Sequence, residues 1–216
     1  MLATRERWVT LCQRLQARGN ISGGITVDST YNRLVTAYNG SDRHYHNINH
    51  ISDGLDELDQ SRHLAEYPDI LEMAWWWHDF IYNAKSPINE YKSSIATDLR
   101  LGKLGLSVDI RNRAGWLIMT TKHDHIPEDH DCRLIIDIDL ASLATPPKIF
   151  DKNTANIRKE YRTAVPDDKI FAIGRTKFFE KLLENRPSIY LTDYFRNKYE
   201  AQAQENLKRI IAKHKN

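Results

Sequence analysis

Histidines and carboxylates gather in four short segments of this chain. It contains nine histidines, and most of them lie in or beside these segments. Imidazole and carboxylate groups are the side chains that bind divalent metals and transfer protons near neutral pH. The pattern therefore indicates a metal site or acid–base chemistry. The segments are residues 43–50, 78–79, 122–125 and 137–140.

The pair His78-Asp79 is the sharpest of these signals. Three tryptophans precede the pair, and Phe80, Ile81 and Tyr82 follow it. Removing a carboxylate from water is costly unless a positive group pairs with it. A divalent cation such as Mn, Fe, Zn or Mg would compensate the charge, with the neighbouring imidazole as a second ligand. The dipeptide alone leaves an alternative equally open, which is a buried histidine beside an aspartate that caps a helix or pairs with an arginine.

Asp137 and Asp139 lie in an otherwise apolar stretch with helical spacing. Residues two apart in a helix lie about 200° apart around its axis, so these two carboxylates cannot both face one site. One of them is expected to cap a helix or form a salt bridge. The spacing does not say which.

The remaining histidines are interpreted from their spacing. His46 and His50 are four residues apart, which a helix would place on one face. Because residues 39–49 are rich in turn formers, we expect His50 at a helix start, facing inward, and His46 in the preceding turn as a hydrogen-bonding residue. His123 and His125 are two residues apart, so at most one of them should face a given site. The others show no partner pattern and are expected at the surface: His44, His63, His130 and His214.

The elements that carry these groups are predicted to be helices. Apolar residues recur at i, i+3, i+4 and i+7, and the period-2 alternation of strands is scarce. We predict an all-α, single-domain helical bundle with roughly eight to ten helices. A helix whose sides are nearly all apolar is expected over 70–82, at the centre of the core. Ser86-Pro87 is typical of a helix start. The helix it would open has Ile88, Tyr91, Ile95 and Leu99 on one face.

The other elements follow from stripes, caps and breakers. The first helix carries Trp8, Leu11, Cys12 and Leu15 and should end at Gly19, and a loop over 19–30 then leads to a helix with Tyr31, Leu34, Val35 and Tyr38. Residues 39–42 form a predicted turn. Ile51, Leu55 and Leu58 indicate a helix after the first histidine segment, and Ser107 should cap another. Further helices are expected near 131–143, 150–164, 168–184 and 188–213.

Composition excludes several classes of protein. The 216 residues, with 41 % hydrophobic and 28 % charged, match a globular chain with one core. No apolar stretch is long enough to span a membrane, and the charged start lacks a signal-peptide pattern. A net charge of +2 argues against a protein that coats nucleic acid. Cys12 and Cys132 are too few for a disulfide framework, so we expect a cytoplasmic protein.

Taken in order, these residues resemble the HD-domain superfamily of metal-dependent phosphohydrolases. The hallmark of that superfamily is a first histidine, an adjacent His-Asp pair and a later aspartate, all on helices of an all-α bundle. The chain is most similar to the predicted HD-type metal-dependent phosphohydrolases of about this length. The motifs that carry the resemblance span most of the chain and are Arg43-x-Tyr45-His46-Asn47-x-x-His50, His78-Asp79-x-x-Tyr82, Asn89-Glu90, Thr121-x-His123, Asp137-x-Asp139-Leu140, Arg158-x-Glu160-Tyr161 and Gly174-Arg175.

The resemblance implies a ligand set for one divalent metal ion. It selects His50 as the first histidine and favours Asp139 over Asp137, so the implied ligands are His50, His78, Asp79 and Asp139. Mn, Mg, Fe, Zn, Co and Ni all remain open as the native metal. The metal-binding core would lie within about residues 43–145, with the helices over 150–213 packed on it.

The resemblance also suggests which residues act on the substrate. Some superfamily members carry a Glu-Asp pair three and four residues after the His-Asp pair, where this chain has Tyr82 and Asn83. The catalytic acid or base must then come from elsewhere, and Glu90 and His123 are the candidates. We assign substrate binding to four further residues: Arg43, His46, Lys122 and Arg175.

The implied activity is hydrolysis of a small phosphorylated compound, such as a nucleotide, by metal-activated water. No phosphate-binding loop is visible, since Gly23-Gly24 lacks the lysine and hydroxyl context of such loops. Two alternatives stay open: a di-iron oxygenase of the same superfamily, and a non-catalytic sensor that binds metal and nucleotide. We expect no membrane partner, and aromatic terminal helices of this kind admit a homodimer.

Overall fold

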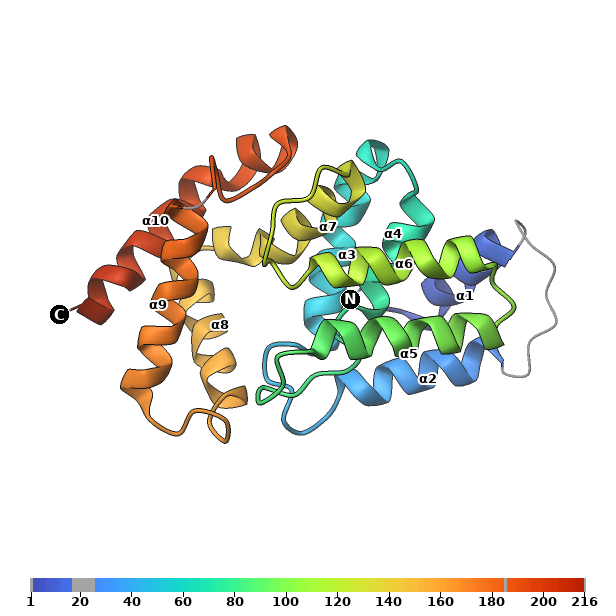
Figure 1. Ribbon diagram of the computed structural model, residues 1–216, viewed down its shortest axis with the longest axis horizontal. Helices are drawn as coiled ribbons and strands as arrows, with labels where there is room; N and C mark the ends of the chain where they lie inside the picture. Colours follow the sequence, from blue (N-terminus) through green and yellow to red (C-terminus); the bar gives the residue numbers. More distant parts are fainter. Residues whose placement is uncertain (1, 17–25, 185, 216) are drawn as a thin grey trace.

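The computed structural model describes residues 2–16, 26–184 and 186–215 of the chain. These residues form ten α-helices and two short 3-10 helices and contain no strand, which confirms the predicted all-α fold (Figure 1). The elements are α1 (Arg5–Gln16), α2 (Val27–Tyr38), α3 (Ile48–Ser61), η1 (Arg62–Leu64), α4 (Pro68–Trp77), α5 (Asn89–Lys103), α6 (Val108–Thr120), α7 (His130–Leu140), η2 (Ala141–Ala144), α8 (Pro147–Glu160), α9 (Asp168–Glu184) and α10 (Asp193–Lys215). None of these helices combines the length and the apolar character that a membrane crossing requires.

Helix α4 is the centre of the core, as its all-round apolar character predicts. The three tryptophans at its end, Trp75, Trp76 and Trp77, are fully buried. The rings of Trp8 from α1 and Trp76 form a T-shaped pair, with their centroids 5.6 Å apart. Helix α4 packs against α1, α3, α5, α6 and α7, so the pair at residues 78–79 begins where these helices converge (Figure 1).

Helix α4 ends at Trp77, five residues before the predicted end at residue 82. The carbonyls at and beyond its last turn find partners outside the helix. The Tyr38 hydroxyl donates to the Trp76 carbonyl at 3.0 Å, and the Arg43 guanidinium donates to the carbonyls of Asp79 and Phe80 at 2.7 and 3.0 Å. Because these tertiary donors replace the N–H groups of a further turn, the chain can leave the helix at His78.

Other boundaries differ from prediction for local reasons. Ser107 caps α6 as expected, but Ser86 does not cap α5, which begins three residues later at Asn89. The side chain of Asn89 ties the loop before it, since its oxygen accepts the Asn83 N–H and its amide donates to the Asn83 carbonyl. Helix α2 already begins at Val27, inside the predicted loop, because Thr26 caps it. Gly19 and Gly23-Gly24 lie outside the described residues.

The last three helices, α8 to α10, gather on one side of the molecule (Figure 1). Helix α9 has its predicted bounds, whereas α10 begins at Asp193 and not near 188. The segment before α10 is held by α7 and its continuation. The Asp137 carboxylate accepts the N–H groups of Leu191 and Thr192, both at 2.7 Å, and the Tyr190 hydroxyl donates to the Leu140 carbonyl.

Candidate metal centre

Two buried imidazoles from separate helices meet at one point. His50 lies in the first turn of α3, which Asn47 caps by accepting the Asn49 N–H, and His78 directly follows α4. Their Nε2 atoms are 3.3 Å apart. A cap before His50 and a helix end at His78 thus aim the same ring nitrogen of each residue at a shared space.

Two carboxylates complete this cluster. An Asp79 oxygen lies 3.2 Å from the His78 Nε2 atom and 3.8 Å from the His50 Nε2 atom. An Asp139 oxygen lies 3.3 Å from the His50 Nε2 atom and 3.8 Å from the His78 Nε2 atom. The ligand atoms of His50, His78 and Asp139 lie within 4.8 Å of one another, so these three residues can hold a metal ion. The Asp79 oxygen is next to them, so all four residues that the resemblance implies as ligands come together.

The ring of His78 is held in the tautomer that a metal needs. Its Nδ1 atom lies 2.8 Å from the Trp75 carbonyl, which can only accept, so Nδ1 carries the hydrogen and Nε2 is free to bind. The Trp75 ring stacks on the imidazole with centroids 4.2 Å apart. Trp75 is itself fixed, because its N–H donates to the Ile51 carbonyl at 2.9 Å.

The charges of the cluster are compatible with a bound cation. Burial lowers the pKa of His78, but the Asp79 and Asp139 carboxylates outweigh this effect and raise it to about 9. Burial likewise raises the pKa of Asp139, yet its bonds to His123 and His50 bring it well below the usual value. Burial also raises the pKa of Asp79, but the charge of His78 outweighs this effect and lowers it. Both half-buried carboxylates therefore stay ionised and attract positive charge into the space between them.

The side chains of Asp137 and Asp139 face different parts of the molecule. This identifies which of the two aspartates faces the histidines, a question that the spacing left open. Asp139 faces the histidines, whereas Asp137 is fully buried on the other side of α7 and accepts three hydrogen bonds from the segment before α10, one of them from the Thr192 hydroxyl at 2.6 Å. Burial raises the pKa of Asp137 to about 6 in spite of these bonds.

His46 is a hydrogen-bonding residue, as expected for the turn before α3. Its Nδ1 atom lies 2.6 Å from a Glu160 oxygen, and its ring stacks on Tyr82 with centroids 4.3 Å apart. Glu160, the last residue of α8, also accepts the N–H groups of Tyr45 and His46 at 2.6 and 2.9 Å. Sequence reasoning left Glu160 out of the site, although it lies in a motif that carries the resemblance.

Of the two histidines after α6, His123 faces the cluster and His125 is exposed. The His123 Nε2 atom donates to the second oxygen of Asp139 at 2.8 Å, while its Nδ1 atom is buried without a partner among the described residues. The backbone of His123 adopts a left-handed conformation with a φ of 58°. This turn directs the ring inward.

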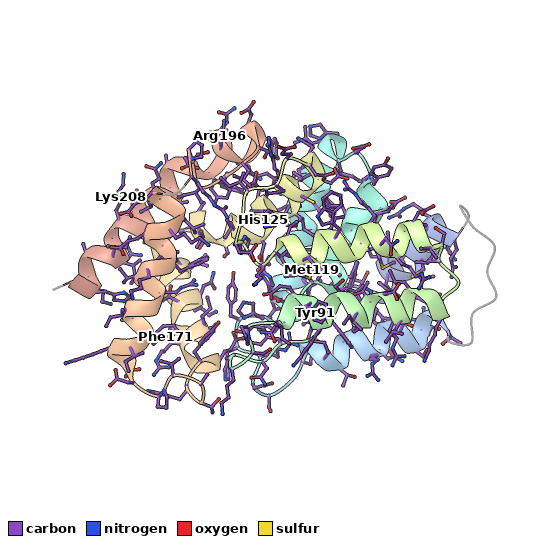
Figure 2. All side chains as sticks on the ribbon, viewed as in Figure 1. Tyr91, Met119, His125, Phe171, Arg196 and Lys208 are labelled. Atoms are coloured by element: carbon purple, nitrogen blue, oxygen red, sulfur yellow. The ribbon has the colours of Figure 1, made fainter. Side chains whose placement is uncertain are left out.

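A cavity of about 570 Å³ opens next to the cluster. His78, Asp79 and Glu90 line it on one side and residues of α9 on the other, where Figure 2 labels Phe171. Tyrosines and aliphatic side chains cover much of the remaining wall: Tyr45, Tyr82, Tyr161, Leu140, Leu143, Ile157 and Val165. The cavity is therefore large enough for a small organic molecule with one end at the cluster.

Arg175 is a half-buried positive charge in the wall of this cavity. Its guanidinium lies over the rings of Phe178 and Phe179, 5.3 and 4.5 Å from their centroids. It has no ion pair with any residue that the structure describes, and its Nε atom is buried without a hydrogen-bond partner. Burial lowers the pKa of Arg175, but an arginine stays protonated in proteins. A half-buried guanidinium without an ion pair is suited to bind an anion.

The other predicted substrate residues are placed less directly. Arg43 donates to three backbone carbonyls, those of His46, Asp79 and Phe80, and is not among the described residues that line the cavity. Arg43 therefore stabilises the turn after α4. Lys122 lines the cavity but is exposed and pairs with Asp124 at 3.2 Å.

Glu90 lies in the first turn of α5 and reaches the cavity half-buried. Burial raises the pKa of Glu90, and the negative charge of Asp79 acts in the same direction. A carboxylate with this environment holds a proton more readily than an exposed one. That property suits a group that accepts a proton during a reaction.

Comparisons with models of protein families, with curated proteins and with solved structures find no match to this chain.

Proposed function

We propose that the protein is a metal-dependent phosphohydrolase of the HD-domain kind, acting on a small phosphorylated compound such as a nucleotide. One observation carries the proposal: the His50, His78 and Asp139 ligand cluster lies at the wall of a cavity that also holds the unpaired guanidinium of Arg175. Metal ligands beside a fixed positive charge match the two needs of a phosphate ester, which are an activated water and a partner for its negative oxygens.

The donor set suits a divalent transition metal. It offers imidazole nitrogens together with carboxylate oxygens, a mixture that favours Mn, Fe, Co, Ni or Zn over the all-oxygen sites of Mg and Ca. Asp79 would be a fourth ligand or would hold a coordinated water. When bound, the ion would lower the pKa of its water towards neutrality and polarise a phosphoryl oxygen.

Residues of the chain divide the remaining tasks. Arg175 would bind the oxygens of the phosphate, because its guanidinium has no competing anion among the described residues. Glu90 would accept the proton of the attacking water, for which its raised pKa is suited. His123, held by Asp139 through Nε2, would donate a proton from Nδ1 to the leaving oxygen. The tyrosines of the wall would contact the organic group.

A second candidate is the di-iron oxygenase. It is favoured by Asp139, whose one oxygen faces His50 and His78 while the other contacts His123. A carboxylate that presents its two oxygens to separate histidines could contribute one oxygen to each of two ions. Redox-active iron at two equivalents per chain would support this reading over the hydrolase.

The test combines metal content with turnover. Protein purified without chelator is analysed for metals and then incubated with a panel of phosphate monoesters, diesters and nucleotides. We expect about one equivalent of metal per chain and release of phosphate that stops in His78→Ala and weakens, with full metal content, in Arg175→Ala. Metal loading with tight nucleotide binding but no turnover would mean a sensor, and absence of any metal would refute the proposal.

A further inference from the structure

Gly174, inside α9, is a glycine for which packing gives no reason. Glycine destabilises a helix interior relative to alanine, so a glycine inside a helix calls for a packing or a functional reason. In the described helices Gly54, Gly102 and Gly115 have a packing reason, since an added methyl group would lie 1.9, 2.9 and 2.8 Å from the nearest atom. A methyl group at Gly174 would meet nothing within 4 Å. The space in front of Gly174 is therefore open.

This open space belongs to the cavity beside the candidate metal centre. Gly174 lines that cavity, and so do residues one turn before and after it on α9, which are Ile170, Phe171 and Phe178. They are three or four residues from Gly174, so they share its face of the helix. Because Gly174 is exposed and also lines the cavity, it lies where the cavity opens to solvent. A side chain at this position would narrow the opening.

Aromatic rings form the wall beside Gly174. The Tyr161 ring packs against Phe171 with the centroids 5.8 Å apart, and both residues line the cavity. Tyr82 also lines it, and its hydroxyl donates to Glu160 at 3.2 Å. Because that hydroxyl is engaged, Tyr82 presents mainly ring carbon to a ligand. This part of the cavity therefore suits an apolar group, and aromatic groups pack well against such rings.

The cavity has little positive charge to spare for a second anionic group. Apart from histidines and carboxylates, the charged residues that line it are Lys122 and Arg175. Lys122 is exposed and already pairs with Asp124. One phosphate can pair with Arg175 and with a metal ion at the cluster, but a further anion would lie near Glu90 with no free cation among the lining residues. Removing an unpaired charge from water is unfavourable, so the cavity favours an uncharged organic group.

We propose that Gly174 and the rings beside it bind the organic group of the substrate, and that the substrate is a phosphate monoester whose organic group is uncharged and apolar, such as an aromatic ring. The phosphate would lie between the cluster and Arg175, and the organic group would extend along α9 past Gly174. Gly174 is then a specificity-determining residue, because its missing side chain leaves room for that group. The inference rests on the proposed phosphohydrolase function and names its class of substrate.

Binding of phosphonates tests the site without turnover, because a phosphonate has no ester bond to break. Calorimetric titration of the Mn-loaded chain compares methylphosphonate, phenylphosphonate and 4-carboxyphenylphosphonate. In the wild type we expect phenylphosphonate to bind at least about ten-fold more tightly than methylphosphonate, because its ring buries apolar surface. The carboxyphenyl compound should bind at least about ten-fold more weakly than phenylphosphonate, because its second charge finds no free cation.

Gly174→Leu tests the role of the open space. Its affinity for phenylphosphonate should fall at least about ten-fold, to that for methylphosphonate, because the new side chain takes the place of the ring. Affinity for methylphosphonate should not change. The variant is expected to fold, since its Cβ atom meets no other atom within 4 Å, and an unchanged Tm checks this.

Ile173→Leu is the matched control. Ile173 precedes Gly174 on α9, is 56 % exposed and is not among the described residues that line the cavity, so both affinities should equal those of the wild type. Equal binding of methylphosphonate and phenylphosphonate by the wild type, or an unchanged phenylphosphonate affinity in Gly174→Leu, would overturn this inference and leave the proposed function standing. A chain that takes up no Mn, or that binds none of the three phosphonates, would overturn both.

Discussion

Gly54→Ala is predicted to damage both the fold and the metal centre, because Gly54 is where α3 passes over Trp75. A methyl group on Gly54 would lie 1.9 Å from Cζ2 and 2.2 Å from Cε2 of the Trp75 ring. Carbon atoms in contact need about 3.5 to 4.0 Å, so either the ring or a helix must move by about 1.5 Å. The Trp75 ring also forms the floor under His78, with the centroids 4.2 Å apart. Any movement of the Trp75 ring therefore shifts His78, a candidate metal ligand.

The magnitude follows from three contributions to the free energy of unfolding. Overpacking a core by a methyl group costs about 1–3 kcal/mol, and the upper end applies where a rigid indole is the obstacle. Loss of the hydrogen bond from the Trp75 N–H to the Ile51 carbonyl costs about 1 kcal/mol. Alanine stabilises a helix interior by about 1 kcal/mol over glycine. The net expectation is a loss of about 2–3 kcal/mol.

The chain offers a matched control in Gly174→Ala. Gly174 is also inside a helix, α9, but a methyl group there meets nothing within 4 Å. That variant should keep or gain up to about 1 kcal/mol. Urea unfolding measures both variants, and a lower midpoint with an unchanged slope would show lost stability in Gly54→Ala. Calorimetric titration with Mn or Zn should show at least a ten-fold weaker affinity. A Gly54→Ala protein as stable as the control would refute the described packing of α3 on Trp75.

Three further predictions concern single groups. His50→Ala or Asp139→Ala should abolish metal loading, so that added metal, which stabilises the wild type by about 2.7 kcal/mol at 100 times its Kd, no longer raises the Tm. Burial raises the pKa of Asp129, but hydrogen bonds from Arg113 and from the backbone outweigh it and lower the pKa to about 2. This carboxylate therefore stabilises the fold above its unfolded pKa, by about 1–2 kcal/mol at neutral pH, and the stabilisation is lost as the pH falls towards 2. Urea unfolding should show a lower free energy of unfolding for Asp129→Asn than for the wild type at pH 7, and this difference should disappear in acid. Glu90→Gln should keep its metal and slow phosphate release at least ten-fold, and an unchanged rate would remove Glu90 from proton transfer.

The sequence predicted helices well where the evidence was periodic and poorly where distant residues decided the boundary. Helix α9 has its predicted bounds, and the stripe of α1 is buried as expected. The end of α4 was wrong because Tyr38 and Arg43, more than thirty residues earlier, supply the donors that terminate it. The start of α5 was wrong because Asn89 binds the preceding loop, so Ser86 does not act as a cap. No local pattern contains this information.

The convergence of the four candidate metal ligands was predicted from residue type, order and the family resemblance, whereas the surroundings of the predicted substrate residues were predicted only in part. A carboxylate among tryptophans needs a compensating partner, which drew attention to Asp79 and its neighbour His78, and the family resemblance then selected a metal as that partner. The partner of an arginine cannot be predicted in this way, since a guanidinium can donate equally to phosphate oxygens or to backbone carbonyls. The spacing therefore could not tell that Arg43 holds the turn after α4 while Arg175 lacks a partner. The hydrolase activity itself stays a prediction.

The geometry of α7 explains why the C-terminal helices belong to the site. Two aspartates on opposite sides of one helix act in different directions: Asp139 towards the metal cluster and Asp137 towards the backbone before α10. Two residues of the C-terminal helices contribute to the site. Glu160 binds the turn before His50, and Arg175 places a positive charge in the wall of the cavity. Packing of the C-terminal helices on the rest of the chain thus supports the position of His50 and places Arg175 in the cavity beside the cluster. Loss of the C-terminal helices would leave the four candidate ligand residues in the chain but remove the Glu160 contacts to the turn before His50 and the segment that Asp137 binds.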